Sequence, residues 1–175
     1  MRAVFFLLAL PLLATAPAWA QSHKPAAVPA KADAAKKINS FDDWTAATHT
    51  EAGQTVCYAF VRASHSAPAI AGRGEVVLTV TQRPSGRDAV AISAGFAYPA
   101  NASVAVQVDQ TALDFYVAGR SAFARDGHAA AIALGHGKQV TARSPGPRKA
   151  VVTDTFSLKG FGHAYEAINK ACPPK

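Results

Sequence analysis

The sequence predicts an all-β fold, an antiparallel sandwich or barrel that a C-terminal amphipathic helix covers at one end or edge. Short runs of alternating apolar and polar residues recur along the chain. Turn-forming residues separate about eight such runs at intervals of about 8 to 12 residues, which is typical of sandwiches and barrels. The period becomes helical only near residue 160. One domain is expected from 38 to 172, and its ~135 residues can bury a single core.

The first 20 residues have the pattern of a secretory signal peptide. Arg2 precedes an apolar run over 3–13, and Ala18-Trp19-Ala20 fits an A-x-A cleavage site. The apolar run is too short to span a bilayer. An uncleaved membrane anchor is the alternative to a cleaved signal peptide. The chain is therefore expected to be exported, as a periplasmic, outer-envelope-associated or secreted protein.

A tether is predicted between the signal peptide and the domain. Residues 21–37 are mainly Ala, Pro and Lys, and they lack the large apolar groups that would offset the entropy of ordering. Four of the chain's lysines lie there. Arg2 of the signal peptide contributes one unit to the formal net charge of +7, and the rest is divided about equally between tether and domain. Nucleic-acid binders usually concentrate basic charge on one folded face. The sequence therefore predicts no nucleic-acid partner.

Both cysteines, Cys57 and Cys172, follow the signal peptide. An even number of cysteines in an oxidising compartment predicts one disulfide, and two buried free thiols are the alternative. The bridge would close a loop of about 115 residues, for which the chain-entropy model gives roughly 4 to 5 kcal/mol.

The first half of the domain is predicted to hold four strands. Residues 41–44 (Phe-Asp-Asp-Trp) are expected to form an edge strand, and 54–63 a strand covered on both faces. A loop over 64–73 follows. Residues 75–81 alternate regularly, and the turn formers of 83–88 predict a hairpin. The fourth strand is expected over 89–95.

The second half begins with a further hairpin, in which a strand over 103–109 is followed by a strand through Leu113, Phe115 and Val117. The pattern breaks between Gly119 and Gly137. Within that region 121–125 predict a helical turn or a strand, and the Ala-rich 127–134 a short helix.

Two strands and a helix complete the domain. Strands are expected over 138–143 and 151–158, joined by the two-proline turn 144–149. In the final helix, one face carries Phe161, Tyr165, Ile168 and Cys172, and the opposite face His163, Glu166 and Lys170. Prolines stop this helix, and 173–175 form a short tail.

Candidate catalytic residues are few. Gly119 to Phe123 lacks the second glycine of a nucleophile elbow. Ser121, Asp126 and His128 would form a triad only if the fold brought them together. His128 and His136 are too far apart for a usual zinc motif. Asp154 is the carboxylate expected near the core, where it would cap backbone groups or pair with a basic residue. The sequence thus predicts no cofactor and no metal.

Two basic segments are candidate partner contacts, 83–87 and 143–149, although solvated turns explain them equally well. Their basic residues are Arg83, Arg87, Arg143, Arg148 and Lys149.

Five motifs in order resemble the invasion-associated locus B family of bacterial secreted and envelope proteins. They are Phe41-Asp-Asp-Trp44, Val56-Cys57-Tyr58-Ala59, Val80-Thr81-Gln82-Arg83-Pro84, Ala94-Gly95-Phe96, and Thr153-Asp-Thr-Phe-Ser-Leu-Lys-Gly-Phe161 before an Ala-rich helix and Cys172. The resemblance implies an immunoglobulin-like β-sandwich, export, and association with the cell envelope or with host-cell entry.

Three functions follow as hypotheses. The first is a non-enzymatic binding protein that contacts an envelope component or a host surface. The second is a small periplasmic hydrolase or metal-dependent enzyme that uses the 119–137 region. The third is a structural envelope-stress factor without a fixed ligand. Fold alone does not choose among them, because function depends on sites.

Overall fold

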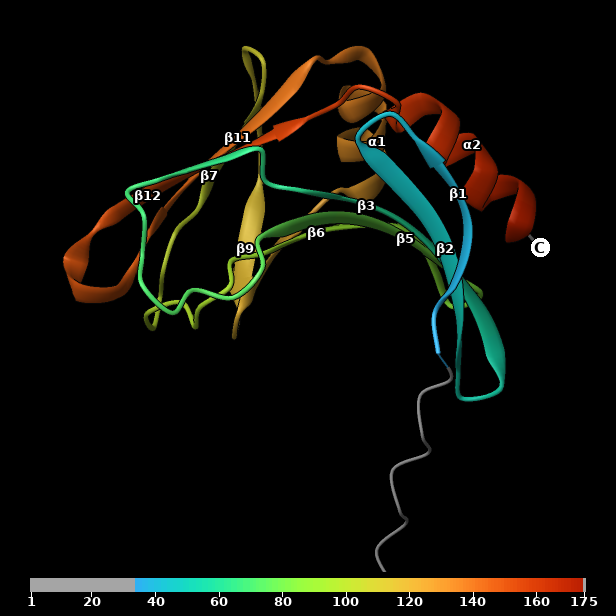
Figure 1. Cartoon of the computed structure of the whole chain (residues 1–175), viewed down its shortest axis with the longest axis horizontal. Helices are drawn as coiled ribbons and strands as arrows, with labels where there is room; N and C mark the ends of the chain where they lie inside the picture. Colours follow the sequence, from blue (N-terminus) through green and yellow to red (C-terminus); the bar gives the residue numbers. More distant parts are fainter. Residues whose placement is uncertain (1–33, 175) are drawn as a thin grey trace, which may run out of the picture. The chain divides into compact units, whose positions relative to one another are not determined.

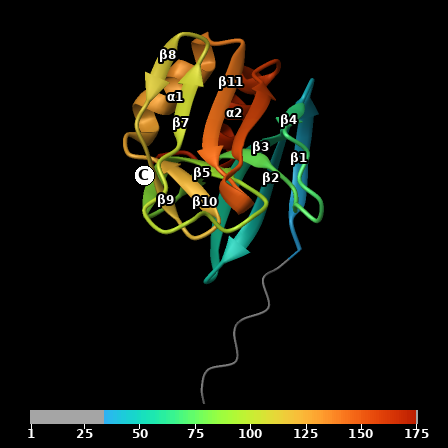
Figure 2. The same ribbon diagram turned by 90° about the vertical axis from the view of Figure 1, so that its left-hand side faces the viewer.

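The computed structural model describes residues 34–174, which form two antiparallel β-sheets and two α-helices (Figures 1 and 2). The signal peptide and most of the predicted tether lie outside these residues. Sheet A has seven strands, in the spatial order β1 (Lys36–Phe41), β2 (Trp44–Glu51), β3 (Gln54–Arg62), β5 (Val77–Arg83), β6 (Gly86–Ser93), β10 (Ser121–Ala124) and β9 (Phe115–Ala118). Sheet B has five strands, in the order β4 (His65–Ala67), β12 (Val151–Ser157), β11 (Gln139–Pro145), β7 (Ala105–Val108) and β8 (Thr111–Leu113).

Trp44 lies where sheet A, sheet B and the C-terminal helix meet. Its side chain is fully buried, and its indole Nε1 donates a hydrogen bond to the carbonyl of Ser157 at 3.0 Å. Phe161 packs edge-on against it, with ring centroids 4.8 Å apart. Inward-facing apolar residues of both sheets and both helices form the main core around this point, and Ala94, Phe96 and Val152 form a smaller second cluster. The predicted all-β sandwich with a C-terminal helix is confirmed.

The C-terminal helix α2 (Phe161–Ala171) contacts β1, β2 and β3 of sheet A through its apolar face. Phe161, Ala164 and Ile168 are buried, whereas His163, Glu166 and Lys170 are exposed, as the helical period predicts. A disulfide joins Cys57 of β3 to Cys172 at the end of α2, with Cα atoms 6.0 Å apart. The early strand and the last helix are therefore covalently linked. No helix among residues 34–174 is long and apolar enough to cross a membrane.

The prediction of an edge strand over Phe41–Trp44 was wrong. Asp42 and Asp43 form the two-residue turn between β1 and β2, and Asp42 adopts a positive φ of 48°. Asp tolerates this conformation, and two-residue turns with positive φ suit hairpins. The edge strand is β1, which begins at Lys36 within the range assigned to the tether.

Three further boundaries differ from prediction. The strand expected through Leu113, Phe115 and Val117 divides at Asp114, because β8 pairs in sheet B and β9 in sheet A. The 64–73 loop contains β4, which adds an edge to sheet B. The 83–88 turn contains only Pro84 and Ser85 between strands. Local patterns gave the turn residues but not the sheet that each strand joins.

Helix α1 (Gly127–His136) forms within the region where the strand pattern breaks, as predicted. Asp126 is its N-cap, since the carboxylate accepts a hydrogen bond from the Ala129 amide at 2.9 Å. A side chain at Gly127 would collide with the carbonyl of Asp88. The first residue of α1 therefore abuts β6, and this contact brings helix residues close to Asp88.

Candidate functional site

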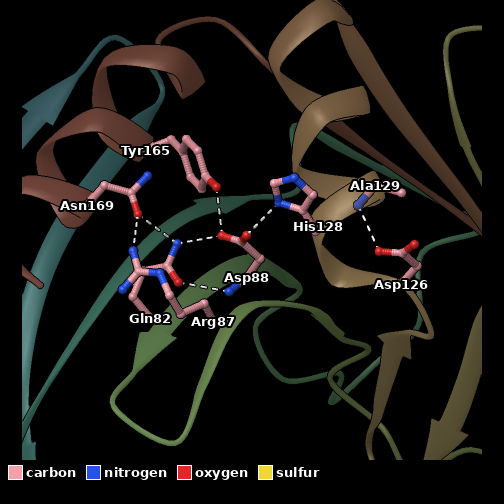
Figure 3. Close-up of polar contacts among 8 residues, drawn as sticks. All are labelled: Gln82, Arg87, Asp88, Asp126, His128, Ala129, Tyr165 and Asn169. Atoms are coloured by element: carbon pink, nitrogen blue, oxygen red, sulfur yellow. Dashed lines mark hydrogen bonds and ion pairs between the residues drawn. The ribbon is translucent and has the colours of Figure 1, made fainter. Parts of the chain in front are cut away.

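A cluster of polar side chains, which we call the Asp88 cluster, lies between the β5–β6 hairpin, α1 and α2 (Figure 3). Its members are Gln82, Arg87, Asp88, His128, Tyr165 and Asn169. Gln82 is fully buried and Asp88 is 8% exposed. Three segments that are distant in sequence therefore share one set of hydrogen bonds.

Asp88 is the acceptor at the centre of the cluster. Its Oδ1 accepts hydrogen bonds from the Tyr165 hydroxyl at 2.7 Å and from Gln82 Nε2 at 2.6 Å. Its Oδ2 lies 3.0 Å from His128 Nδ1. An ionised carboxylate only accepts, so Nδ1 carries the proton of this contact. Each carboxylate oxygen is thus held by a different helix.

Gln82 and Asn169 extend the cluster toward the end of α2. Gln82 Oε1 accepts from the backbone amide of Asp88 at 2.8 Å, and its Nε2 also donates to Asn169 Oδ1 at 3.0 Å. The Arg87 guanidinium donates to the same Asn169 oxygen and to the Cys172 carbonyl, the latter at 2.8 Å. No buried side-chain nitrogen or oxygen in residues 34–174 lacks a partner. Every buried side-chain polar atom of the cluster therefore has at least one partner, which buried polar networks require for stability.

The hydrogen bonds also set the protonation of the cluster. Burial raises the pKa of the Asp88 carboxyl, but the hydrogen bonds from Tyr165, Gln82 and His128 outweigh burial and hold this pKa below its usual value. Burial and the bond to Asp88 raise the pKa of the Tyr165 hydroxyl. At neutral pH the pair is a carboxylate and a neutral phenol.

A surface cavity of about 320 Å³ opens beside the cluster. Arg83 and Arg87 line it together with Cys172 of the disulfide. The rest of the lining consists of Gln54, Thr55, Pro84, Ala171, Pro173 and Pro174. Arg83 is also paired with Glu51 of β2, at 2.7 Å. The volume is at the lower end of the range for ligand pockets, and the lining combines two cationic groups with apolar proline rings.

Asp154 lies away from this cavity, in β12. Its carboxylate accepts two hydrogen bonds from the guanidinium of Arg73, at 2.8 and 2.7 Å, and one from Ser66 Oγ at 2.7 Å. The side chains of Arg73 and Asp154 are 7% and 3% exposed. Asp154 therefore pairs with a basic group near the core, as expected from its neighbours.

Comparison with protein families matches residues 44–169 to the invasion associated locus B (IalB) family. The chain belongs to the invasion associated locus B family. A comparison with curated proteins finds no match. Among solved structures, the crystal structure of invasion associated protein B from Bartonella henselae is similar, with a TM-score of 0.55 and 16% identity. The similarity covers 76% of this chain and 96% of the Bartonella chain and concerns the fold.

In this family member, the five basic residues predicted to contact a partner do not form one surface. Arg83 and Arg87 lie on the β5–β6 hairpin of sheet A and line the cavity. Arg143 lies in β11 of sheet B. Arg148 and Lys149 lie in the single 3₁₀ turn before β12. Arg83, Arg87 and Arg143 are strand residues. Arg83 and Arg87 lie in strands because β5 and β6 extend into the predicted turn, whereas Arg143 lies within the strand predicted over 138–143.

The residues of the hypothetical triad have separate roles in this family member. Asp126 caps α1, and His128 pairs with Asp88 and not with Asp126 or Ser121. The described residues contain no group of three His, Cys, Asp or Glu side chains placed to hold a metal ion. The hydrolase hypothesis for the 119–137 region is therefore not supported by its proposed residues.

Sequence reasoning did not identify Gln82, Asp88, Tyr165 or Asn169 as a group. Gln82 falls between the predicted strand 75–81 and the predicted turn 83–88, Asp88 falls in that turn, and Tyr165 falls on the apolar face of the last helix. One signal was present in the sequence, because the alternation of β5 points a polar Gln82 to the buried side after Leu78 and Val80. A polar residue at a core position implies buried hydrogen-bond partners.

Proposed function

We propose that this protein is an exported, non-enzymatic binding protein that contacts an envelope component or a host-cell surface. One observation supports this most: Arg83 and Arg87, two candidate contact residues, line one cavity with apolar proline rings. A concave site of this kind accepts an anchoring side chain of a partner. The acidic and histidine side chains of the neighbouring cluster meanwhile connect secondary-structure elements.

Export is supported by the N-terminal pattern and by the disulfide, since disulfides persist in oxidising compartments. The mature protein would begin at Gln21. Periplasmic, outer-envelope and secreted residence are all consistent with this proposal.

Saturable binding tests the proposed function directly. Labelled mature protein is incubated with solubilised envelope and, separately, with host-cell surface extract. Arg83→Ala should weaken saturable binding to one of them by about tenfold, as loss of an interface anchor does. Arg62→Ala is the matched control, because Arg62 is an exposed strand arginine paired with a glutamate at 2.7 Å, as Arg83 is, and is not a candidate contact. Saturable binding to neither preparation would contradict the proposal and favour the structural envelope hypothesis.

A further inference from the structure

The two sheets have four edge strands in the described part of the chain, and three of them are protected against further pairing. β1 carries Lys36 and Lys37 and has a register irregularity between Lys37 and Asn39. β4 and β8 have only three residues each. Charge, irregularity and short length are the usual protections of sheet edges.

The fourth edge, β9, is one residue longer than β4 and β8, and it lacks the charge and the irregularity of β1. Its four residues, Phe115–Ala118, contain no charge and no proline, and their register with β10 is regular. The Asp114 carbonyl accepts a hydrogen bond from the Arg125 amide at 2.9 Å. Because bonding directions alternate in antiparallel pairs, Tyr116 and Ala118 also bond toward β10. The N–H and C=O groups of Phe115 and Val117 therefore point to the open edge.

The available stretch is limited on one side by a loop contact. Gly119 also directs its carbonyl outward, but this oxygen already accepts a hydrogen bond from the Tyr98 amide at 3.0 Å. An added strand can therefore pair with Phe115 and Val117 but not with Gly119. This restriction selects the register of any strand that binds here.

An exposed aromatic row reaches this edge on the outer face of sheet A. The Tyr116 side chain is 42% exposed. Its ring stacks on Phe123 of β10 with centroids 5.6 Å apart, and the Arg125 guanidinium lies 5.4 Å from its centroid. A strand paired with β9 would cover the open side of Tyr116.

We propose that two copies of this chain associate by antiparallel pairing of β9 with β9, centred on Tyr116. Phe115 of each copy pairs with Val117 of the other, so the outward main-chain groups of both residues are satisfied. When two identical strands pair in antiparallel orientation, a two-fold axis relates them, so the pairing gives a closed dimer. Pairing centred on Val117 would instead place Phe115 opposite Gly119 of the second copy. The Gly119 carbonyl already accepts a hydrogen bond from the Tyr98 amide, so this register is disfavoured.

Side chains are complementary in this register. Tyr116 lies opposite Tyr116 of the second copy, so that the Phe123–Tyr116 pair continues into a row of four rings, and cross-strand aromatic pairs stabilise sheets. The strand is thus self-complementary in this register, because Tyr116 meets Tyr116 and Phe115 meets Val117 of the second copy, and this favours a second copy over an unrelated strand.

Sedimentation analysis of the mature protein over a concentration series tests this association. The expected result is reversible doubling of mass with rising concentration. Val117→Pro removes one outward N–H, which an edge strand tolerates, and should raise the dissociation constant by about tenfold or more. Ile132→Ala is the control, because Ile132 is half exposed on α1. A monomer at all concentrations, or a dimer that Val117→Pro does not weaken, would overturn the proposal.

Cysteine cross-linking tests the register independently of Val117→Pro. Two Tyr116 Cα atoms at a non-hydrogen-bonded position would be about 4.5 Å apart, which a disulfide can bridge. Tyr116→Cys should therefore give a covalent dimer on a non-reducing gel. Ala118→Cys should stay monomeric, since it lies opposite Asp114. Cross-linking of Ala118→Cys without that of Tyr116→Cys would rule out this register.

Discussion

Arg73 and Asp154 form an ion pair with almost no access to water. Breaking such a pair leaves a charge in a low-dielectric environment, which typically costs about 3 to 5 kcal/mol. Arg73→Met should therefore lower the free energy of unfolding by roughly that amount, measured by urea denaturation. Asp154 would retain only Ser66 as a side-chain donor.

Arg62 and Glu75 provide the matched control for this experiment. They form an ion pair of the same 2.7 Å length, but their side chains are 61% and 66% exposed. Exposed pairs contribute little because water screens them, so Arg62→Met should leave the unfolding midpoint nearly unchanged. Equal effects of the two substitutions would show that burial does not determine the strength of the Arg73 pair.

Asp88 should make the free energy of unfolding depend on pH. Its pKa is lower in the folded state than in the unfolded chain, where about 3.9 is usual. The ionised Asp88 carboxylate therefore contributes its full stabilisation above the pKa of the unfolded chain, and this contribution is lost as pH falls through the pKa of the folded state. Asp88→Asn should cost about 1.5 to 3 kcal/mol at neutral pH, as loss of charged hydrogen bonds does. The difference from wild type should shrink below about pH 4 in urea denaturation series.

Tyr165→Phe removes one of the hydrogen bonds that lower the pKa of Asp88, because the phenol donates directly to Asp88 Oδ1. The Asp88 carboxyl should titrate at higher pH in this variant, as followed by NMR. Unchanged titration would mean that Gln82 and His128 alone hold the pKa down.

Residue-level expectations were reliable where local sequence determines the contact. Asp154 lies two positions from Val152 and two from Phe156, so it shares their strand face, and this pattern indicates a position near the core. The Asp88 cluster could not be predicted in this way. Its bonds join Asp88 to Tyr165, 77 positions later, and to His128, 40 positions later. Such contacts depend on where the helices pack, which no short-range pattern specifies.

At the scale of elements, α2 is held by the disulfide and by several non-covalent contacts. Tyr165 and Asn169 bond to the hairpin, and Ile168 is fully buried. A variant with both Cys57→Ala and Cys172→Ala should therefore lose about 2 to 5 kcal/mol of stability but keep α2 docked. Denaturation measures the loss, and hydrogen exchange in α2 measures docking. Rapid exchange throughout α2 under native conditions would show that the disulfide alone holds the helix.

Both helices were predicted from the sequence because each has a local cause. The apolar face of α2 repeats every three or four residues, and α1 is rich in Ala. The division at Asp114 has no such cause. Leu113, Phe115 and Val117 alternate as one strand would, yet β8 and β9 join different sheets. Alternation indicates which side chains turn inward but not which neighbour a strand pairs with.

At the scale of the whole domain, its first and last parts are neighbours. The Trp44 indole bonds to Ser157, 113 positions away, and Cys57 is linked to Cys172, 115 positions away. The amide of Asp43 donates to the Lys159 carbonyl at 3.3 Å. Folding must therefore close a loop of nearly the whole domain, and such non-local contacts slow folding.

The disulfide should accelerate folding because it closes this loop in advance. Loop-closure entropy must be overcome before distant contacts stabilise the chain, and a covalent link removes that step from the unfolded ensemble. The oxidised protein should refold from urea roughly tenfold faster or more than the variant with both cysteines replaced by Ala, if the transition state joins the ends. Stopped-flow Trp fluorescence measures both rates, since Trp44 becomes buried at the junction. Equal refolding rates, with faster unfolding of the variant, would place the meeting of β3 and α2 after the transition state.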